Sequence, residues 1–133
     1  DAAPRFVPPA LRGRVLVVED DSVNQQVIDL FLKKMNLTPT FAGDGEAAIA
    51  TTTANEYDIV LMDCQLPGID GMEATRRIRT LRAGKPLLIV ALTANASTHV
   101  REACLAAGMN DFLSKPVRFE LLANLLARHL PAA

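Results

Sequence analysis

The chain has little of what would indicate a disulfide scaffold, a membrane protein or a nucleic-acid binder. The chain of 133 residues has two cysteines, one tyrosine and no tryptophan, and its formal net charge is −1. Cys64 and Cys104 lie in apolar surroundings, which is typical of reduced packing residues rather than of a disulfide or a metal cluster. The balance of charge argues against bulk electrostatic binding of nucleic acid or a membrane surface.

Long hydrophobic runs are also missing. No apolar stretch is long enough to span a bilayer, and the chain shows no signal-peptide pattern. We therefore expect a cytoplasmic domain without direct membrane contact, either alone or attached to a membrane-anchored parent chain. Because the first residue is Asp1 rather than Met, we expect a piece of a longer chain or a processed product.

Hydrophobic residues, by contrast, are plentiful at 50%, enough for the core of one domain. Residues 1–12 carry Pro4, Pro8 and Pro9 and show no periodicity, which predicts a linker or an arm that orders on contact. Residues 13–131 are predicted to form the domain itself.

Within that domain, apolar strand patterns alternate five times with helical patterns. The predicted strands are 14–19, 37–41, 57–62, 87–92 and 111–114, and the predicted helices are 22–34, 46–54, 72–81, 98–107 and 119–129. Such alternation predicts an α/β fold with a parallel sheet covered on both faces. Pro39 cannot donate a ladder hydrogen bond, so the second strand is expected at a sheet edge. This favours a flavodoxin-like three-layer sandwich of strand order 2-1-3-4-5.

The helices carry predicted caps and inward faces. Asp21 or Ser22 is expected to cap the first helix, and Gly108 to end the fourth. Arginines 76, 77, 79 and 82 are expected to form a solvated helix face. The residues expected to share one face of the first helix are Val23, Val27, Leu30, Phe31 and Lys34. The residues expected to point inward are Met72, Ile78 and Leu81 in the third helix, and Leu121, Leu122, Leu125 and Leu126 in the last.

Polar side chains gather at the carboxyl ends of the predicted strands, where ligands of such sheets bind. They are Glu19, Asp20 and Asp21 after the first strand, Asp63 after the third, Thr93 after the fourth and Lys115 after the fifth. Two carboxylates about 4 Å apart repel by roughly 4 kcal/mol at an effective dielectric near 20. A proton or a cation must relieve that repulsion, and Mg²⁺ is the hard cation that prefers such oxygen ligands, with Mn²⁺ as an alternative.

An aspartate beside such a cation and a lysine can act as a covalent nucleophile and form an aspartyl-phosphate. Phosphoryl transfer depends mainly on in-line positioning and on neutralised oxygens. Lys115 and the metal would neutralise the phosphoryl group on Asp63, and the Thr93 hydroxyl would donate a hydrogen bond to one of its oxygens.

Four motifs resemble the response-regulator receiver domain, and the resemblance covers nearly all of residues 14–129. The motifs are Val-Leu-Val-Val-Glu-Asp-Asp (15–21), Leu-Met-Asp-Cys-Gln-Leu-Pro-Gly-Ile-Asp-Gly (61–71), Ala-Leu-Thr-Ala-Asn-Ala (91–96) and Phe-Leu-Ser-Lys-Pro (112–116). Each motif alone gives moderate support for the resemblance, whereas all four in this order and spacing give strong support.

The resemblance implies a role for each matching residue. Asp63 matches the phosphorylated aspartate, Asp20 a direct Mg²⁺ ligand, and Glu19 a ligand that acts through water. The backbone carbonyl of Gln65 matches a further metal ligand. Thr93 and Phe112 match a switch pair, Lys115 matches the phosphate-contacting lysine, and its bond to Pro116 is the candidate cis peptide.

Several short sequence segments also resemble the receivers of bacterial hybrid sensor histidine kinases. Glu19 in place of a first aspartate, Asn24-Gln25, the 62–65 segment and the 92–96 segment all share this likeness. It implies a histidine kinase core or a histidine phosphotransfer domain as partner, with dimerisation also open and no nucleic acid expected. The Pro-rich arm would then be an interdomain linker.

Three other functions compete with this interpretation. An aspartate-nucleophile phosphohydrolase of the haloacid dehalogenase type needs a second aspartate two residues after the nucleophile, where Gln65 stands. A flavodoxin-like flavin binder needs a Ser/Thr/Gly-rich phosphate loop after the first strand, where the acidic residues 19–21 would repel a phosphate. A degenerate receiver would bind partners without being phosphorylated, but all the expected site residues are present.

Overall fold

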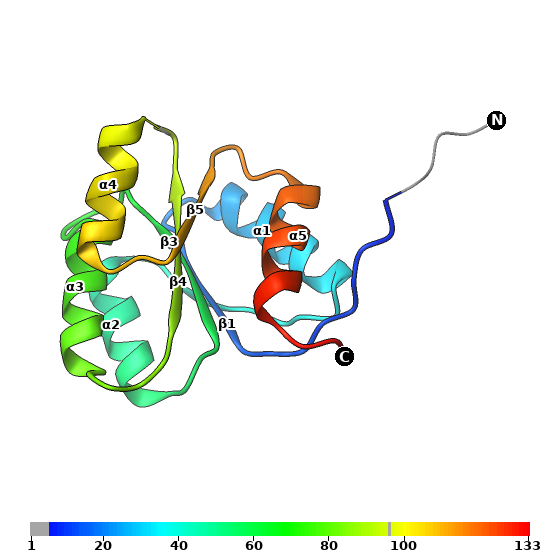
Figure 1. Ribbon diagram of the computed structural model, residues 1–133, viewed down its shortest axis with the longest axis horizontal. Helices are drawn as coiled ribbons and strands as arrows, with labels where there is room; N and C mark the ends of the chain where they lie inside the picture. Colours follow the sequence, from blue (N-terminus) through cyan, green and yellow to red (C-terminus); the bar gives the residue numbers. More distant parts are fainter. Residues whose placement is uncertain (1–5, 96) are drawn as a thin grey trace.

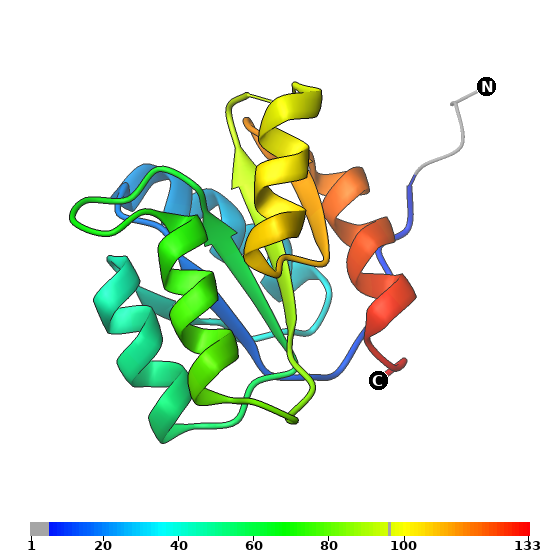
Figure 2. The ribbon, with the colours of Figure 1, turned by 60° about the vertical axis from the view of Figure 1, so that its left-hand side comes forward.

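The structure, a computed structural model, describes residues 6–95 and 97–133, which build one parallel sheet between two layers of helices (Figures 1 and 2). The strands are β1 (Val15–Val18), β2 (Thr40–Ala42), β3 (Ile59–Asp63), β4 (Leu88–Thr93) and β5 (Asp111–Ser114). The helices are α1 (Ser22–Lys34), α2 (Gly45–Ala54), α3 (Gly71–Leu81), α4 (Thr98–Ala107) and α5 (Phe119–His129). The order β2-β1-β3-β4-β5 confirms the predicted topology.

Strand β1 shows why this sheet must be covered on both faces. Successive side chains of a strand point to opposite faces. Val15 and Val17 join the cluster under α1 and α5, whereas Leu16 and Val18 join the cluster under α2, α3 and α4. Figure 1 shows the two helical layers on either side of the sheet. The apolar side chains on both faces of this strand are therefore buried against helices.

The second strand lies at the predicted edge but begins later than predicted. Leu37 lies instead in the turn that follows α1, where its N–H donates to the Leu32 carbonyl at 2.9 Å. Asn36 adopts a left-handed conformation, with φ of 65°, and so turns the chain at the helix end. The strand starts at Thr40, beyond Pro39, and the predicted range of 37–41 was wrong at both ends.

The apolar face predicted for α1 is not the face that packs against the sheet. Ile28 and Leu32 are buried, whereas Val23, Val27 and Leu30 are 63%, 40% and 55% exposed. The helix carries two apolar stripes, and the stripe that continues to the buried Met35 lies against the sheet. Of the other residues in the predicted face, Phe31 is half-buried and Lys34 is exposed.

The remaining helix predictions are largely confirmed. Ile78 is buried in α3 and Met72 is half-buried, and Leu122, Leu125 and Leu126 are buried in α5. Two leucines predicted to point inward are exposed instead, Leu81 and Leu121. Asp21 caps α1, since its carboxylate accepts hydrogen bonds from the backbone N–H groups of residues 23 and 24, and Gly108 ends α4 with φ of 108°.

Two of the four arginines predicted to be solvated are structural. The Arg79 guanidinium donates to the backbone carbonyls of Leu87 and Gly108. Arg82 is buried and donates to the Thr52 carbonyl at 2.9 Å. Only Arg76 and Arg77 have exposed side chains as predicted.

The described part of the N-terminal arm packs against the domain. The buried Leu11 donates its N–H to the Met35 carbonyl at 2.9 Å, and Arg12 donates to the Pro131 carbonyl at 3.0 Å. The ring of Phe6 meets Phe119 edge-on at 5.6 Å between centroids. The boundary at residue 12 stays a prediction, and Pro4 lies outside the described residues. In the part of the chain that the structure describes, no helix has the length and apolarity needed to cross a bilayer.

Candidate functional site

The parallel strands bring the predicted polar residues to one rim of the sheet. Asp63 ends β3, and Thr93 ends β4. Glu19 and Asp20 directly follow β1, and Lys115 directly follows β5. Because β1 and β3 are neighbours and the strand order reverses beside them, this rim is where a sheet of this type opens toward ligands.

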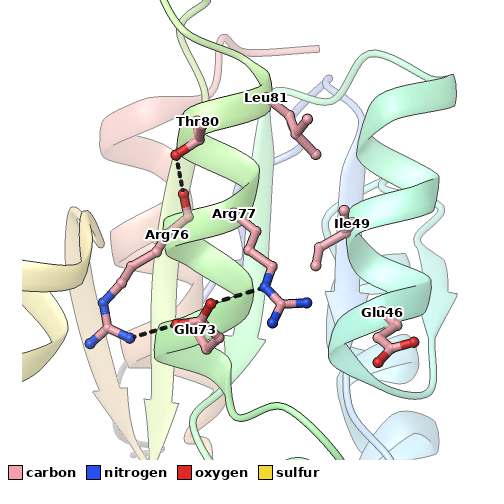
Figure 3. Close-up of a pocket in the computed structure, with 7 residues that line it drawn as sticks. All are labelled: Glu46, Ile49, Glu73, Arg76, Arg77, Thr80 and Leu81. Atoms are coloured by element: carbon pink, nitrogen blue, oxygen red, sulfur yellow. Dashed lines mark hydrogen bonds and ion pairs between the residues drawn. The ribbon is translucent and has the colours of Figure 1, made fainter.

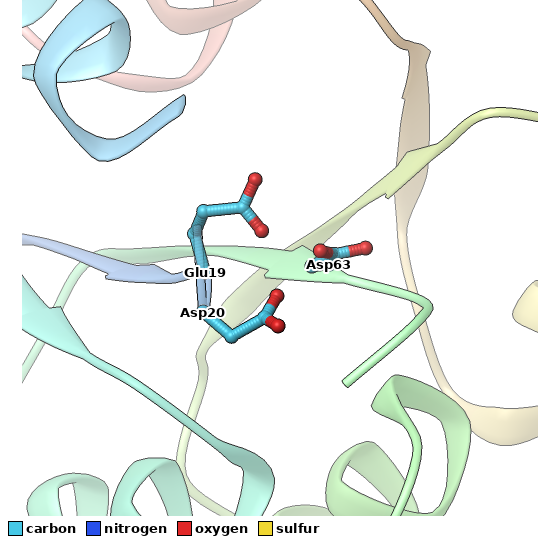
Figure 4. A group of neighbouring side chains, drawn as sticks. All are labelled: Glu19, Asp20 and Asp63. Atoms are coloured by element: carbon cyan, nitrogen blue, oxygen red, sulfur yellow. The ribbon is translucent and has the colours of Figure 1, made fainter. Parts of the chain in front are cut away.

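Three carboxylates form an acidic cluster at the rim. Each of Glu19, Asp20 and Asp63 offers an oxygen that lies within 4.8 Å of the others. Glu19 and Asp63 are 0% and 3% exposed, whereas Asp20 is exposed. Figure 4 shows the side chains of Glu19 and Asp20 directed toward Asp63. A donor set made only of oxygens, with one of its three carboxylates exposed to solvent, fits a hard cation such as Mg²⁺.

Lys115 connects the two buried carboxylates. Its ammonium donates to Asp63 Oδ2 at 2.8 Å and to Glu19 Oε1 at 3.1 Å. Burial alone would lower the pKa of Lys115, but the contacts with Asp63 and Glu19 outweigh burial and raise it. The bond to Pro116 is cis, as predicted, and the Lys115 backbone N–H donates to the Thr93 carbonyl at 2.8 Å. The lysine is therefore a fixed cation at the acidic cluster.

Glu19 is in an unfavourable position when it is ionised. Burial, followed by the hydrogen bond with Asp63, raises the pKa of Glu19 to about 7, although Lys115 opposes this rise. A second cation beside Lys115 would favour the ionised form of Glu19. The electrostatics of the cluster thus agree with its geometry as a cation site.

The backbone around Asp63 fixes the direction of its side chain. The N–H of Gln65 donates to Asp63 Oδ1 at 2.9 Å. Gly71 packs so closely that a Cβ there would overlap the backbone carbonyl oxygen of Asp63. A close approach between segments eight residues apart has no local signature in the sequence. The predicted metal contact through the Gln65 carbonyl stays a prediction.

The predicted switch residues lie on neighbouring strands, and a third residue accompanies them. The Thr93 hydroxyl donates to the Asn95 carbonyl at 2.9 Å and accepts the Asn95 N–H at 3.0 Å. Phe112 is half-buried on the face covered by α4. The guanidinium of Arg101, from α4, lies 4.1 Å from the centroid of the Phe112 ring. Nothing in the sequence pattern of α4 indicated that Arg101 contacts this ring.

Both cysteines are free and buried, in agreement with the prediction. Their sulfur atoms lie 3.7 Å apart. Burial, together with the neighbouring Cys104, raises the pKa of the Cys64 thiol to about 12. A thiol in that state is a poor nucleophile, so Cys64 is a packing residue beside the site rather than a reactive group.

Two cavities differ in their relation to the acidic cluster. A groove of about 600 Å³ between α2 and α3 is lined by Glu46, Ile49, Glu73, Arg76, Arg77, Thr80 and Leu81 (Figure 3). Its two arginines pair with Glu73 at 3.1 and 2.9 Å, and none of the rim residues lines it. A smaller cavity of about 350 Å³ adjoins the rim and is lined by Glu19, Asn24, Val27, Ile28, Lys115, Pro116 and Val117. The smaller cavity is the one that belongs to the candidate site.

Comparison with known protein families gives one consistent result. A family model described as the response regulator receiver domain matches residues 15–127. The chain is 38% identical over 129 residues to hybrid signal transduction histidine kinase A of Dictyostelium discoideum, covering 94% of this chain and 6% of that protein. It is 38% identical over 118 residues to the sensor histidine kinase GacS of Pseudomonas protegens, covering 86% of this chain and 13% of that protein. The chain thus spans a small fraction of the length of these relatives.

Solved structures are similar over most of the chain. The receiver domain of a sensor histidine kinase from Pseudomonas aeruginosa, with a magnesium ion coordinated in the active site cleft, has a TM-score of 0.81 and 44% identity, covering 88% of this chain and 96% of that one. A co-crystal structure from Saccharomyces cerevisiae contains the histidine phosphotransfer protein Ypd1 and the receiver domain of its downstream response regulator Ssk1. The matching chain has a TM-score of 0.84 and 31% identity, covering 93% of this chain and 91% of that one.

Proposed function

We propose that Asp63 is the phosphoacceptor of this chain, which belongs to the response regulator receiver domain family of two-component phosphorelay signalling. The single observation that carries the proposal is the nearly buried Asp63 carboxylate, which contacts the Lys115 ammonium at 2.8 Å inside an acidic cluster. A buried carboxylate with a fixed cation on one oxygen and further carboxylates beside it that can hold a second cation is suited to hold a phosphoryl group.

The transfer moves one phosphoryl group from nitrogen to oxygen. A carboxylate oxygen of Asp63 attacks the phosphorus of a phosphohistidine in line with the leaving imidazole, so that the P–N bond breaks as the P–O bond forms. The imidazole leaves and takes up a proton. Lys115 then lies close enough to Asp63 to contact an oxygen of the transferred group, and Thr93 supplies a hydroxyl at the end of the neighbouring strand.

Asp20, Asp63 and the Gln65 backbone carbonyl would hold Mg²⁺ directly, and Glu19 would act through water. Mg²⁺ supplies neutralisation of the phosphoryl oxygens when it is bound. The acidic cluster and the magnesium ion in the similar Pseudomonas aeruginosa receiver support this choice, with Mn²⁺ as an alternative occupant of the same oxygen ligands.

Incubation with acetyl phosphate and Mg²⁺ tests the phosphoacceptor proposal. We expect a single phosphoryl adduct by intact-mass spectrometry, stable in acid and labile in base. Sustained release of phosphate from a generic phosphomonoester would favour the phosphohydrolase instead, and the absence of any adduct would favour a receiver that only binds partners.

We propose that a histidine phosphotransfer domain or a kinase core docks on the exposed apolar face of α1. Val23, Val27 and Leu30 are exposed there, and Val27 also lines the cavity that reaches Lys115. An exposed apolar patch is typical of an interaction site, and this one lies beside the acceptor. The yeast complex of a phosphotransfer protein with a similar receiver supports this class of partner.

Leu30→Asp is expected to slow phosphoryl transfer from a histidine phosphotransfer domain by at least about tenfold, because a charge would then have to be buried in the interface. Labelling by acetyl phosphate should stay at the wild-type rate, since that small donor needs no docking surface and Leu30 does not line the cavity beside Lys115. The matched control is Leu81→Asp, which places the same charge on an exposed leucine of α3. Equal transfer rates in Leu30→Asp and the wild type would contradict docking on α1.

The cellular context belongs to the same proposal. The likeness to receivers of hybrid kinases supports a parent chain with a kinase core, in which Asp63 would be a relay point. In that setting the domain would be cytoplasmic, attached to a parent chain that is anchored in the membrane or not, and residues 1–12 would be the linker. Dimerisation through this domain stays a prediction.

We further propose that phosphorylation shifts a two-state equilibrium. Phosphoryl on Asp63 would draw the Thr93 hydroxyl away from Asn95, and Phe112 would turn inward toward the space vacated by Thr93. The face formed by α4, β5 and α5 would change as a result.

A further inference from the structure

We propose that Arg101 is a positioning residue that holds Phe112 in its resting place and so sets how readily the domain responds to phosphorylation. This inference rests on the proposed function, because it assigns a regulator to the same switch pair. It adds a residue outside the four motifs, on a helix that carries none of the site residues.

The contact itself is specific in its geometry. The guanidinium carbon of Arg101 lies 4.1 Å from the Phe112 ring centroid, closer than the other two cation–aromatic contacts among the described residues, at 5.1 and 5.3 Å. Within residues 6–95 and 97–133, Arg101 forms no ion pair with a carboxylate. The guanidinium therefore lies over the ring without a competing carboxylate, and an arginine suits this contact better than a lysine.

The location of the contact ties it to the switch. Phe112 pairs with Ala91 in the sheet register, two residues before Thr93 on β4, and its ring packs in the cluster under α4. Thr93 is meanwhile held by its two hydrogen bonds to Asn95. Both members of the switch pair thus have a partner in this structure, and inward movement of Phe112 would require the ring to leave Arg101.

Removing Arg101 should therefore favour the phosphorylated arrangement. When the competent state is a minor fraction of the protein, apparent ligand affinity rises in proportion to that fraction. Loss of an exposed cation–aromatic contact from the resting state predicts a rise of roughly two- to fivefold. The direction is discriminating, because deleting a positive charge by itself would weaken the binding of an anion.

The test measures the binding of beryllofluoride, a mimic of the aspartyl-phosphate, by calorimetry in the presence of Mg²⁺. Arg101→Ala should bind about two- to fivefold more tightly than the wild type, and Arg101→Lys should lie between them. In a Phe112→Leu background, Arg101→Ala should have no further effect, because the partner ring is gone. Arg76→Ala, which removes an exposed arginine of α3 with no aromatic partner, should bind slightly more weakly or the same.

A second readout separates positioning from a general structural effect. In protein with labelled phenylalanine, the Phe112 ring signal of free Arg101→Ala should shift toward its beryllofluoride-bound position, whereas the other phenylalanine signals should stay in place. Unchanged or weaker affinity in Arg101→Ala, with wild-type binding intact, would overturn this inference alone. Failure of the wild type to bind beryllofluoride would overturn the proposed function and this inference together.

Discussion

Asp63→Asn is expected to abolish phosphorylation by acetyl phosphate and by any phosphohistidine donor. An amide keeps the shape of the side chain and its hydrogen bond from Gln65, but it lacks the anionic oxygen that attacks phosphorus. The remaining rim carboxylates are not equivalent, because only Asp63 both ends a strand and contacts Lys115 at 2.8 Å. Radiolabel incorporation and intact mass measure the result.

The matched control for Asp63→Asn is Asp21→Asn, which alters the aspartate that follows Asp20 in the sequence and is not assigned to the cluster. Asp21 caps α1, and asparagine is an equally good cap, so stability and labelling should both stay at wild-type values. Labelling of Asp63→Asn at more than a trace of the wild-type level would mean that another residue is the acceptor.

Lys115→Met is expected to have two large effects, one on chemistry and one on stability. Phosphorylation should slow by about 10²–10³-fold, the usual cost of removing one fixed group that stabilises developing charge. The free energy of unfolding without Mg²⁺ should fall by roughly 3 kcal/mol, because Glu19 and Asp63 are left buried without their shared cation. Chemical denaturation and acetyl phosphate kinetics measure the two effects.

Added Mg²⁺ should restore much of the stability of Lys115→Met, since a cation at the acidic cluster takes over the neutralisation. The matched control is Lys33→Met, which breaks an exposed pair with Asp29 and should cost less than about 1 kcal/mol. Stability and labelling of Lys115→Met equal to those of the wild type would show that Lys115 is only a surface lysine.

The gathering of the candidate site residues at one rim could be predicted from the sequence, and the reason is physical. In a parallel sheet all strands end at the same edge, so residues that follow strands in the sequence meet in space. Asp63, Thr93 and Lys115 are far apart in the chain, yet each stands at or just beyond a strand end. Locating the strands was therefore sufficient to predict that these side chains share one rim.

Features that depend on tertiary packing were predicted less well. Helix α1 has apolar residues on two faces, and periodicity indicated the face of Val23 and Leu30, which is exposed, and not that of Ile28 and Leu32, which is buried. The exposed apolar face is the one we propose as a docking surface. The sequence predicted Leu37 to be part of a strand. In the structure Asn36 is left-handed and turns the chain, so that the Leu37 N–H donates to a carbonyl in the last turn of α1.

Single contacts between distant segments could not be predicted from the sequence. The closeness of Gly71 to the Asp63 carbonyl and the contact of the Arg101 guanidinium with the Phe112 ring each join residues whose local sequence is ordinary. Arg79 was predicted to be solvated together with the arginines at positions 76 and 77. Its guanidinium instead donates to backbone carbonyls in the loops before β4 and β5. Such contacts follow from the assembled fold rather than from any local pattern.

Borohydride trapping of the phosphorylated wild-type protein identifies the phosphorylated residue. The reagent reduces an aspartyl-phosphate to homoserine, and tandem mass spectrometry of the peptides then locates the modified residue. We expect homoserine at position 63 alone, formed only when both the phosphodonor and Mg²⁺ are present. Homoserine at another position, or a phosphoryl group that survives base and resists reduction, would contradict this expectation.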